Sequence, residues 1–334
     1  MMLKFSLILP VYNVERFLPD CLDSLYCQNI SEEEYEIICV IDGSPDNSAQ
    51  VVRSYMAKHH NIKLIEQPNS GVGVARNRGF CEASGKYVWF IDPDDMIASN
   101  CLGKIFQLME MHNADIFEFA YSTCGENEKF VPHEIGFEAD GENRAGSSGS
   151  GCLSVCLSDY LRKNRIKFNP QLHYGEDYLW AFQTKYRDHR SLYTHAKLYI
   201  YRQRTNSAMH IASREKTEKH LQDSLLLFDI YQQEYERCEK EKMPTSALIN
   251  IRHRRQLCLD SALWCLMKLK LPHRELLRRL KDLKQKGYYP YRPMFWNLGL
   301  TSVLGPLKLR LLKLLFPFEP YYLLVCAAYR ILAK

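Results

Sequence analysis

The sequence lacks several features that would place the chain in other classes of protein. Its 12 cysteines include no Cys-x-x-Cys pair, and Cys152 and Cys156 have no ligand residues beside them. This pattern excludes a disulfide framework and a zinc site, so we expect reduced, mostly buried thiols in a cytoplasmic protein. No internal repeat with a period of about 20–50 residues is present, which excludes a solenoid.

Long hydrophobic runs are also missing. No stretch of about 18 uninterrupted apolar residues occurs, so we expect no membrane-spanning helix. Residues 1–6 lead directly into an expected strand, and we therefore expect no signal peptide.

Acidic residues are scarce toward the C-terminus. Residues 251–334 contain 17 Lys and Arg against 4 Asp and Glu, whereas the 250 residues before them contain 27 against 35. An acidic body with a basic C-terminal region predicts contact with something anionic. Residues 298–334 carry short apolar runs interrupted by cations, rich in Tyr and Phe, as in helices that lie on a membrane surface.

We therefore expect peripheral contact between residues 298–334 and the cytoplasmic face of a membrane. A helical packing subdomain or a dimer interface is the alternative. No recognition motif for nucleic acid accompanies the charge, so nucleic acid is not an expected partner.

The pattern of apolar residues predicts strands that alternate with helices. Strands are predicted at 5–10, 36–41, 62–66, 87–91 and 116–120, with helices at 15–28, about 48–59, 72–83 and 99–113. This spacing predicts an α/β fold with a mainly parallel sheet and right-handed crossovers. Regular patterning stops between residues 124 and 151, where a Gly/Ser-rich surface loop is expected, either a lid or a plain connector.

The rest of the chain is predicted to be mainly helical. Helices are expected at 153–163, 177–186, 217–241, 246–268 and 273–286. We expect an α/β domain over residues 1–210, followed by a helical, basic region over residues 211–334.

Three carboxylates follow the strand predicted at 87–91, at Asp92, Asp94 and Asp95. In a parallel sheet this strand ends at the same edge as those at 5–10 and 36–41, where open α/β folds bind ligands. Crowded carboxylates repel one another, so a positive partner is expected among them. Oxygen-only ligands favour Mg²⁺ or Mn²⁺, which usually also binds a phosphate. A solvated acidic turn is the alternative, because Asp and Pro are ordinary turn formers.

Two further segments suit a nucleotide. Asp42 ends the strand at 36–41, where its carboxylate either accepts a hydrogen bond from a pyrimidine N–H or caps the next helix. Residues 69–77 place glycines at a helix start with Arg76 one turn in, and backbone N–H groups with a guanidinium suit a diphosphate.

The sequence resembles family 2 glycosyltransferases over about residues 5–210. Five motifs occur in the order of that family: Pro10-Val11-Tyr12-Asn13, Asp42-Gly43-Ser44, Gly73-Val74-Ala75-Arg76-Asn77-Arg78-Gly79, Asp92-Pro93-Asp94-Asp95 and Gly175-Glu176-Asp177. These are inverting, nucleotide-sugar-dependent enzymes of the Rossmann-like GT-A fold. The resemblance implies transfer of a sugar from a UDP-sugar to a hydroxyl of a glycan or lipid-linked oligosaccharide, in cell-surface polysaccharide synthesis.

The resemblance also implies roles for single residues. Asp177 corresponds to the general base, and Glu176 beside it orients the acceptor or the loop. The alternative for this pair is a favourable interaction with a helix dipole. The metal, Mg²⁺ or Mn²⁺, is expected on Asp94, Asp95 and His210. The donor is expected to contact Pro10, Tyr12, Asn13, Asp42, Arg76, Asp92, Asp94, Arg204 and Ser207.

The chain departs from the family at one position. Many members have two acids before Gly-Ser, whereas this chain has Ile41 and then Asp42, so no neighbouring acid substitutes for Asp42. Residues 201–210 resemble a family segment that closes over the donor phosphates, with a basic surface loop as the alternative.

Two other functions fit parts of the pattern. A sugar nucleotidyltransferase also combines a Gly-rich loop with an Asp-bound metal, but its loop usually follows the first strand, where this chain has Val11-Tyr12-Asn13. A non-catalytic glycan-binding or assembly subunit would not need Asp92, Asp94, Asp95 and Asp177 all intact.

Overall fold

The computed structural model describes residues 3–142, 150–204, 213–243 and 245–288, together with residues 322, 323 and 326. The chain divides into two compact units, Met1–Ile211 and Ala212–Lys334. In the described ranges no helix combines the length and the apolar character that crossing a bilayer requires. The expected membrane contact of residues 298–334 falls almost entirely outside these ranges.

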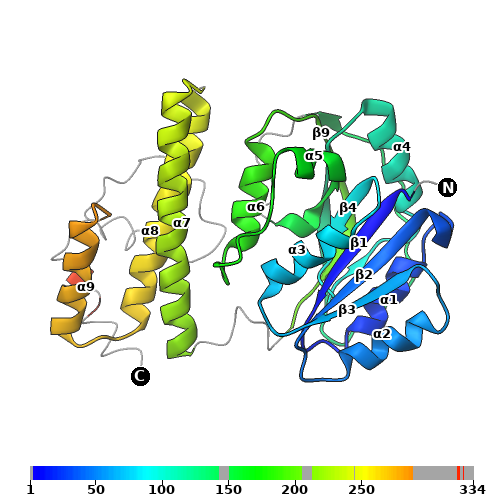
Figure 1. Ribbon diagram of the computed structural model, residues 1–334, viewed down its shortest axis with the longest axis horizontal. Helices are drawn as coiled ribbons and strands as arrows, with labels where there is room; N and C mark the ends of the chain where they lie inside the picture. Colours follow the sequence, from blue (N-terminus) through cyan, green and yellow to red (C-terminus); the bar gives the residue numbers. More distant parts are fainter. Residues whose placement is uncertain are drawn as a thin grey trace. The chain divides into compact units, whose positions relative to one another are not determined.

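A parallel half-sheet forms the N-terminal part of the first unit (Figure 1). Its strands run in the order β3 (Ile62–Gln67), β2 (Tyr35–Asp42), β1 (Phe5–Val11) and β4 (Tyr87–Phe90). The helices between them are α1 (Leu18–Tyr26), α2 (Ser48–Met56) and α3 (Val72–Glu82). These elements confirm the α/β class and the strand positions predicted from the apolar pattern.

The second half of the sheet is mixed. Strand β8 (Ser154–Leu157) is antiparallel to β4 on one side and to β6 (Ile116–Cys124) on the other. Strand β9 (Ser191–Arg202) runs parallel to β6, while β5 (Met96–Ile97) and β7 (Gly141–Glu142) pair with β9 antiparallel. The expected parallel arrangement therefore holds for β3-β2-β1-β4, whereas beyond β4 the sheet is mixed and includes the parallel pair of β6 and β9.

The helix predicted from residue 153 is wrong over its first turn. Residues 154–157 form β8, and helix α5 begins only at Ser158 and ends at Lys163. Val155 packs into the core on one face of the sheet and Cys156 into the core on the other face. An apolar segment buried on both faces has no alternating pattern, so pairing with β4 and β6 determines its structure.

Two apolar cores cover the two faces of this sheet. One face packs alternate residues of β1, β2 and β4 against α1, α2 and α4 (Leu102–His112). The opposite face packs the intervening residues against α3, α5 and α6 (Glu176–Lys185). All 12 cysteines are free thiols, and all but Cys27 and Cys81 are buried, as expected for cysteines used as small core residues.

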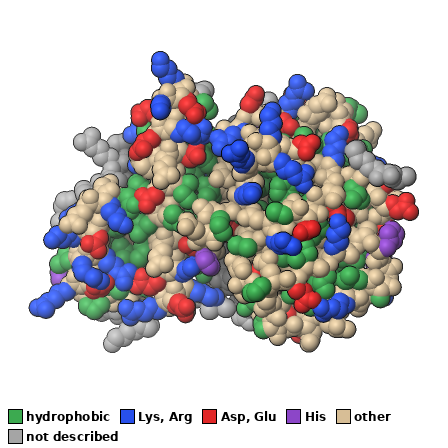
Figure 2. All heavy atoms as spheres, in the orientation of Figure 1, with side chains coloured by type: hydrophobic (Ala, Val, Ile, Leu, Met, Phe, Trp, Pro, Cys, Tyr) green, Lys and Arg blue, Asp and Glu red, His purple; other side chains and the backbone are tan. Residues whose placement is uncertain are grey.

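The second unit is helical in its described residues. It contains α7 (Arg214–Lys240), α8 (Thr245–Lys268) and α9 (His273–Gln285), and α7 and α8 lie side by side (Figure 1). Helix α9 buries Leu276, Leu280 and Leu283 on one side. Its other side exposes cations that include Arg274 and Lys281, and Figure 2 shows Lys and Arg side chains gathered over this helix.

Candidate active site

The acidic turn lies at the carboxyl edge of the sheet, directly after β4. The backbone N–H of Asp95 donates to the carbonyl of Asp92 at 3.0 Å, which closes the turn. The expected neighbours of this turn, the ends of β1 and β2, lie at the same edge because β2, β1 and β4 are adjacent and parallel. The three strand ends therefore meet as the sequence predicted.

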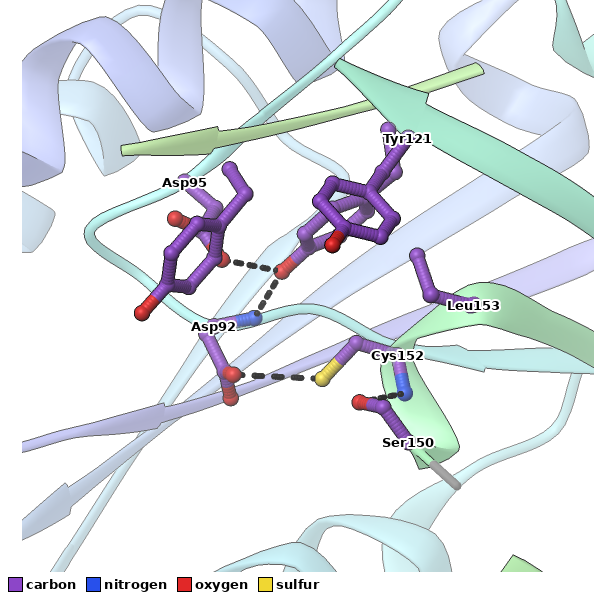
Figure 3. A pocket seen from close by; sticks show the side chains of 8 residues that line it. Asp92, Asp95, Tyr121, Ser150, Cys152 and Leu153 are labelled. Carbon is purple, nitrogen blue, oxygen red and sulfur yellow. Dashed lines mark hydrogen bonds between the residues drawn. The ribbon is translucent and has the colours of Figure 1, made fainter. Parts of the chain in front are cut away.

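Asp95 is the buried anchor of the acidic turn, with an exposed fraction of 1%. The hydroxyl of Tyr199 donates to Oδ2 at 2.8 Å, and the backbone N–H of Arg202 donates to Oδ1 at 2.8 Å. Figure 3 shows the first of these bonds, and a second in which the Tyr199 hydroxyl accepts from the Asp92 N–H at 3.2 Å. Burial, and then repulsion by Asp94 and Asp92, raises the pKa of the Asp95 carboxyl.

Asp92 links the acidic turn, through Arg76, to Glu176 of the expected catalytic pair Glu176 and Asp177. Its Oδ1 forms an ion pair with Arg76 Nη2 at 2.8 Å, and Nη1 of the same guanidinium contacts Glu176 Oε1 at 3.1 Å. The thiol of Cys152 lies 3.2 Å from Asp92 Oδ2 (Figure 3). Arg76 is only 5% exposed, and its guanidinium packs over the ring of Phe168. Arg76 therefore bridges two carboxylates, and its expected contact with a diphosphate stays a prediction.

Asp94 is paired with the second expected arginine. Arg204 Nη2 lies 2.6 Å from Asp94 Oδ2, and the Arg204 guanidinium stacks over the ring of Phe17. Burial raises the pKa of the Asp94 carboxyl, repulsion by Asp92 adds to the rise, and Arg204 opposes it. Arg76 and Arg204 thus supply the positive charge that was predicted among the acids.

Glu176 and Asp177 open helix α6. The chain reaches them through Gly175, whose φ of 79° favours glycine. Burial raises the pKa of Glu176 to about 7, although Arg76 lowers it. Burial also raises the pKa of Asp177, whose Oδ1 accepts a hydrogen bond from the Tyr178 N–H at 2.8 Å. A carboxylate that binds its proton more tightly is a stronger base.

The loop after β1 is held by the loop after β2. The N–H of Asn13, which has a φ of 55°, donates to Ser44 Oγ at 2.8 Å. Tyr12 is 47% exposed, and Pro10 is buried at the end of β1. The three residues expected to line a nucleoside therefore lie at the end of β1 and in the loop after it, where the Tyr12 ring is exposed.

Asp42 has a structural role that differs from the helix cap expected as its alternative. Its two oxygens accept the N–H groups of Ser70 and Gly71, each at 2.8 Å, and Oδ1 also accepts from Gln67 Nε2 at 2.8 Å. These bonds fix the segment that leads into α3, and the carboxylate does not cap α2, the helix that was expected to follow it. Asp42 is 3% exposed, and its predicted contact with a base stays a prediction.

A cavity of about 210 Å³ adjoins the acidic turn on the side of β8, β6 and β9. Its lining residues are Asp92, Asp95, Tyr121, Ser150, Cys152, Leu153, Tyr199 and Tyr201. Figure 3 shows Asp92 and Cys152 on one wall of this cavity and Tyr121 on another. The expected residues Ser207 and His210 lie outside the described residues.

Residues 6–172 match the family described as Glycosyl transferase family 2. The chain belongs to that family. An uncharacterized glycosyltransferase of Bacillus subtilis, EpsJ, is 29% identical over 229 residues, which are 65% of this chain and 66% of EpsJ. A poly(ribitol-phosphate) beta-glucosyltransferase of Bacillus spizizenii is 39% identical over 54% of this chain and 29% of its own length.

Solved structures show the same fold for this family 2 glycosyltransferase. Staphylococcus aureus TarS residues 1–349, in complex with UDP-GlcNAc, aligns with a TM-score of 0.62 at 21% identity, over 98% of this chain and 92% of that one. A mannosyltransferase of Pyrobaculum calidifontis, in complex with GDP-Man and Mn²⁺, aligns with a TM-score of 0.52 at 14% identity, over 100% and 88%. The predicted GT-A class is confirmed.

Members of the GT-A class often use a divalent cation, and the acidic turn suits one. Magnesium and manganese sites usually take one or two protein carboxylates and complete their coordination with substrate phosphates. Asp94 and the partly exposed Asp92 are carboxylates of this kind, and each pairs with one arginine. Among the described side chains no set of three His, Cys, Asp or Glu could hold a metal alone. Both oxygens of Asp95, expected as a ligand, already accept hydrogen bonds.

Sequence reasoning missed the residues of β9 that support the acidic turn. Arg202 is 2% exposed; its Nε donates to the Asp94 carbonyl at 3.0 Å, and its Nη2 contacts Asp20 Oδ2 at 3.2 Å. Its Nη1 donates to the carbonyls of Glu126 and Glu128. Tyr199 and Tyr201 alternate along the same strand, and this period-2 pattern of aromatic residues was the available sign.

Proposed function

We propose that this chain is an inverting glycosyltransferase that moves a hexosyl group from a UDP-sugar to a hydroxyl of a glycan or lipid-linked oligosaccharide in cell-surface polysaccharide synthesis. One observation carries the proposal: Arg76 joins Asp92 of the acidic turn to Glu176, which adjoins Asp177. This contact supports a single site that serves both the leaving group and the attacking hydroxyl.

In this proposal each side chain has one task. Asp177 accepts the proton of the acceptor hydroxyl as that oxygen attacks the anomeric carbon. Glu176 and Arg76 hold the start of α6 against the acidic turn. Tyr12 and Asn13 line the nucleoside, and Asp42 fixes the segment beside it. Asp94, with Asp92, would hold Mg²⁺ or Mn²⁺, which offsets charge on the departing diphosphate when bound.

The test is release of UDP from a panel of nucleotide sugars by the purified chain, with Mn²⁺ and with EDTA. We expect metal-dependent release from one donor, and loss of the metal effect in Asp94→Asn. In Asp177→Asn we expect transfer to fall by about 10²–10⁴-fold while UDP affinity is retained, because the base is lost and the donor site is not. Asp188→Asn, at an exposed position after α6, serves as the matched control.

Two outcomes would favour the other functions. A chain that binds no nucleotide and releases none from any donor would be a non-catalytic glycan-binding or assembly subunit. Formation of a nucleotide sugar from a nucleoside triphosphate and a sugar phosphate would identify a nucleotidyltransferase.

A further inference from the structure

The cavity beside Asp92 has an aromatic rim. Tyr121 and Tyr201 come from β6 and β9, and their rings pack edge to face with centroids 6.3 Å apart. Tyr121 is 50% exposed and Tyr201 is 40% exposed, whereas most large apolar side chains of this unit are buried. Exposed aromatic faces that line a cavity supply a binding surface for a ligand with an apolar face.

The strand order separates this cavity from the nucleoside side of the site. Strand β4, which leads to Asp92, has β1 on one side and β8 on the other. The loops after β1 and β2 carry Tyr12 and Asp42, whereas the cavity is built from residues of β6 and β9 and from the segment that precedes β8. Its occupant is therefore a part of the reaction beyond the nucleotide.

The charge of the lining residues limits the kind of ligand that the cavity can bind. The cavity is lined by two carboxylates, Asp92 and Asp95, and none of its lining residues in the described part of the chain is a cation. A phosphate group would be repelled there. Hydroxyl groups, in contrast, can donate to a carboxylate such as Asp92, which is partly exposed.

The cavity is large enough for one sugar ring and is open to solvent at its rim. A volume of 210 Å³ corresponds to roughly seven waters at about 30 Å³ each, enough for a single sugar ring. Both rim tyrosines face solvent, so a chain attached to that ring can continue outward. Of the two proposed metal ligands, Asp92 lines the cavity and Asp94 does not.

We propose that this cavity is the acceptor subsite and selects a neutral sugar ring over a polyol phosphate, with Tyr121 and Tyr201 against the apolar face of the ring and Asp92 accepting from its hydroxyls. This inference rests on the proposed function and names the acceptor class for the same site.

The experiment measures binding without catalysis. The full chain, saturated with UDP and Mn²⁺, is titrated with methyl glucoside, methyl galactoside, methyl N-acetylglucosaminide and ribitol phosphate, with saturation-transfer NMR as the readout. We expect at least one glycoside to bind more tightly than ribitol phosphate. In Tyr121→Ala the Kd of that glycoside should rise about tenfold, and in Tyr121→Phe it should stay within about twofold, because the ring is kept.

UDP affinity, measured by calorimetry, separates the two halves of the site. Tyr12→Ala should weaken UDP binding, whereas Tyr121→Ala should weaken glycoside binding by the larger factor. The inference would be overturned if the wild type bound no glycoside or bound ribitol phosphate more tightly. It would also be overturned if Tyr121→Ala left the glycoside Kd unchanged or lost UDP affinity by the same factor as glycoside affinity. Tyr121-dependent glycoside binding by a chain that binds no UDP would instead refute the proposed function alone.

Discussion

Buried carboxylates at the two edges of the sheet have pKa values that are shifted in opposite directions. At the amino edge, Glu36 at the start of β2 accepts hydrogen bonds from Ser6 Oγ and the Ser84 N–H, each at 2.6 Å, and pairs with Lys63 Nζ at 2.6 Å. Burial alone would raise the pKa of Glu36, but these partners lower it below the usual value. At the carboxyl edge, the pKa values of Asp94, Asp95, Glu176 and Asp177 are all raised.

The difference indicates that the acid at one edge stabilises the fold, whereas the acids at the other edge belong to the candidate active site. At the amino edge, the hydrogen-bond and ion-pair partners of Glu36 stabilise its ionised carboxylate, and this stabilises the fold. The carboxyl edge buries acids whose partners do not offset the cost of burial, which lowers stability and is typical of a functional site. Three substitutions would sharpen or break this comparison.

The largest effect is expected at Arg202, the buried cation that supports the acidic turn. Arg202→Met removes one partner of the ion pair with Asp20 and leaves three backbone carbonyls without their donor. Loss of one partner of a buried pair costs about 3–5 kcal/mol. Urea unfolding should show a fall of this size in the free energy of unfolding.

The control for Arg202→Met is Lys104→Met. Lys104 pairs with Glu138 at 2.7 Å, and their side chains are 30% and 72% exposed. A surface pair of this kind contributes about 0–1 kcal/mol. Equal losses in the two variants would show that Arg202 does not support the turn as described.

The next effect concerns Glu176 and depends on pH. The unfolded chain ionises Glu176 near its ordinary pKa of 4.5, whereas the folded chain holds the proton to about 7. The native state therefore binds more protons between these values, and wild-type stability falls as pH rises through this window. Glu176→Gln does not titrate, so its stability relative to wild type should rise from pH 4.5 to 7 by up to about 3 kcal/mol and then level off. Denaturant unfolding at several pH values measures this, and a flat difference would contradict it.

The smallest effect is expected at Glu36, with the opposite sign. Because its folded pKa is lowered, its contribution is present above the unfolded value of 4.5 and is lost as pH falls through the folded pKa. Glu36→Gln should therefore lower the free energy of unfolding at pH 7 by about 1–3 kcal/mol, since charged hydrogen bonds are removed. The deficit should shrink in acid, and a deficit that grows there would count against this account.

The parallel half of the fold was predictable from the sequence because each strand is followed by its own helix. Hydrophobic runs such as residues 36–41 and the turn residues after them identify elements locally. Strands β8 and β9 were not foreseen, since their structure depends on pairing with β4 and β6 far along the chain. The helical second unit was predicted from its 3.6-residue periodicity, and its described helices begin within three residues of the expected positions.

The candidate site was predictable in its residues more than in its contacts. Asp92, Asp94, Asp95, Glu176 and Asp177 were identified from motifs, and the strand ends do meet. The partners were not foreseen: Arg76 bridges Asp92 and Glu176, and Asp42 binds the backbone before α3. Such contacts depend on side-chain directions that spacing along the sequence does not specify.

The bond between Arg202 and Asp20 also has a consequence for how the site forms during synthesis. The two residues are separated by 182 positions, and the matched family region ends at residue 172, before β9. A nascent chain that has emerged only as far as α6 already contains all three acids of the turn, but not the strand that holds Asp95 and the Asp94 carbonyl in place. Closing so long a loop is slow and comes late in folding. The acidic turn therefore acquires its final shape only after β9 has joined the sheet, and an N-terminal fragment of the chain would carry the motif without the site.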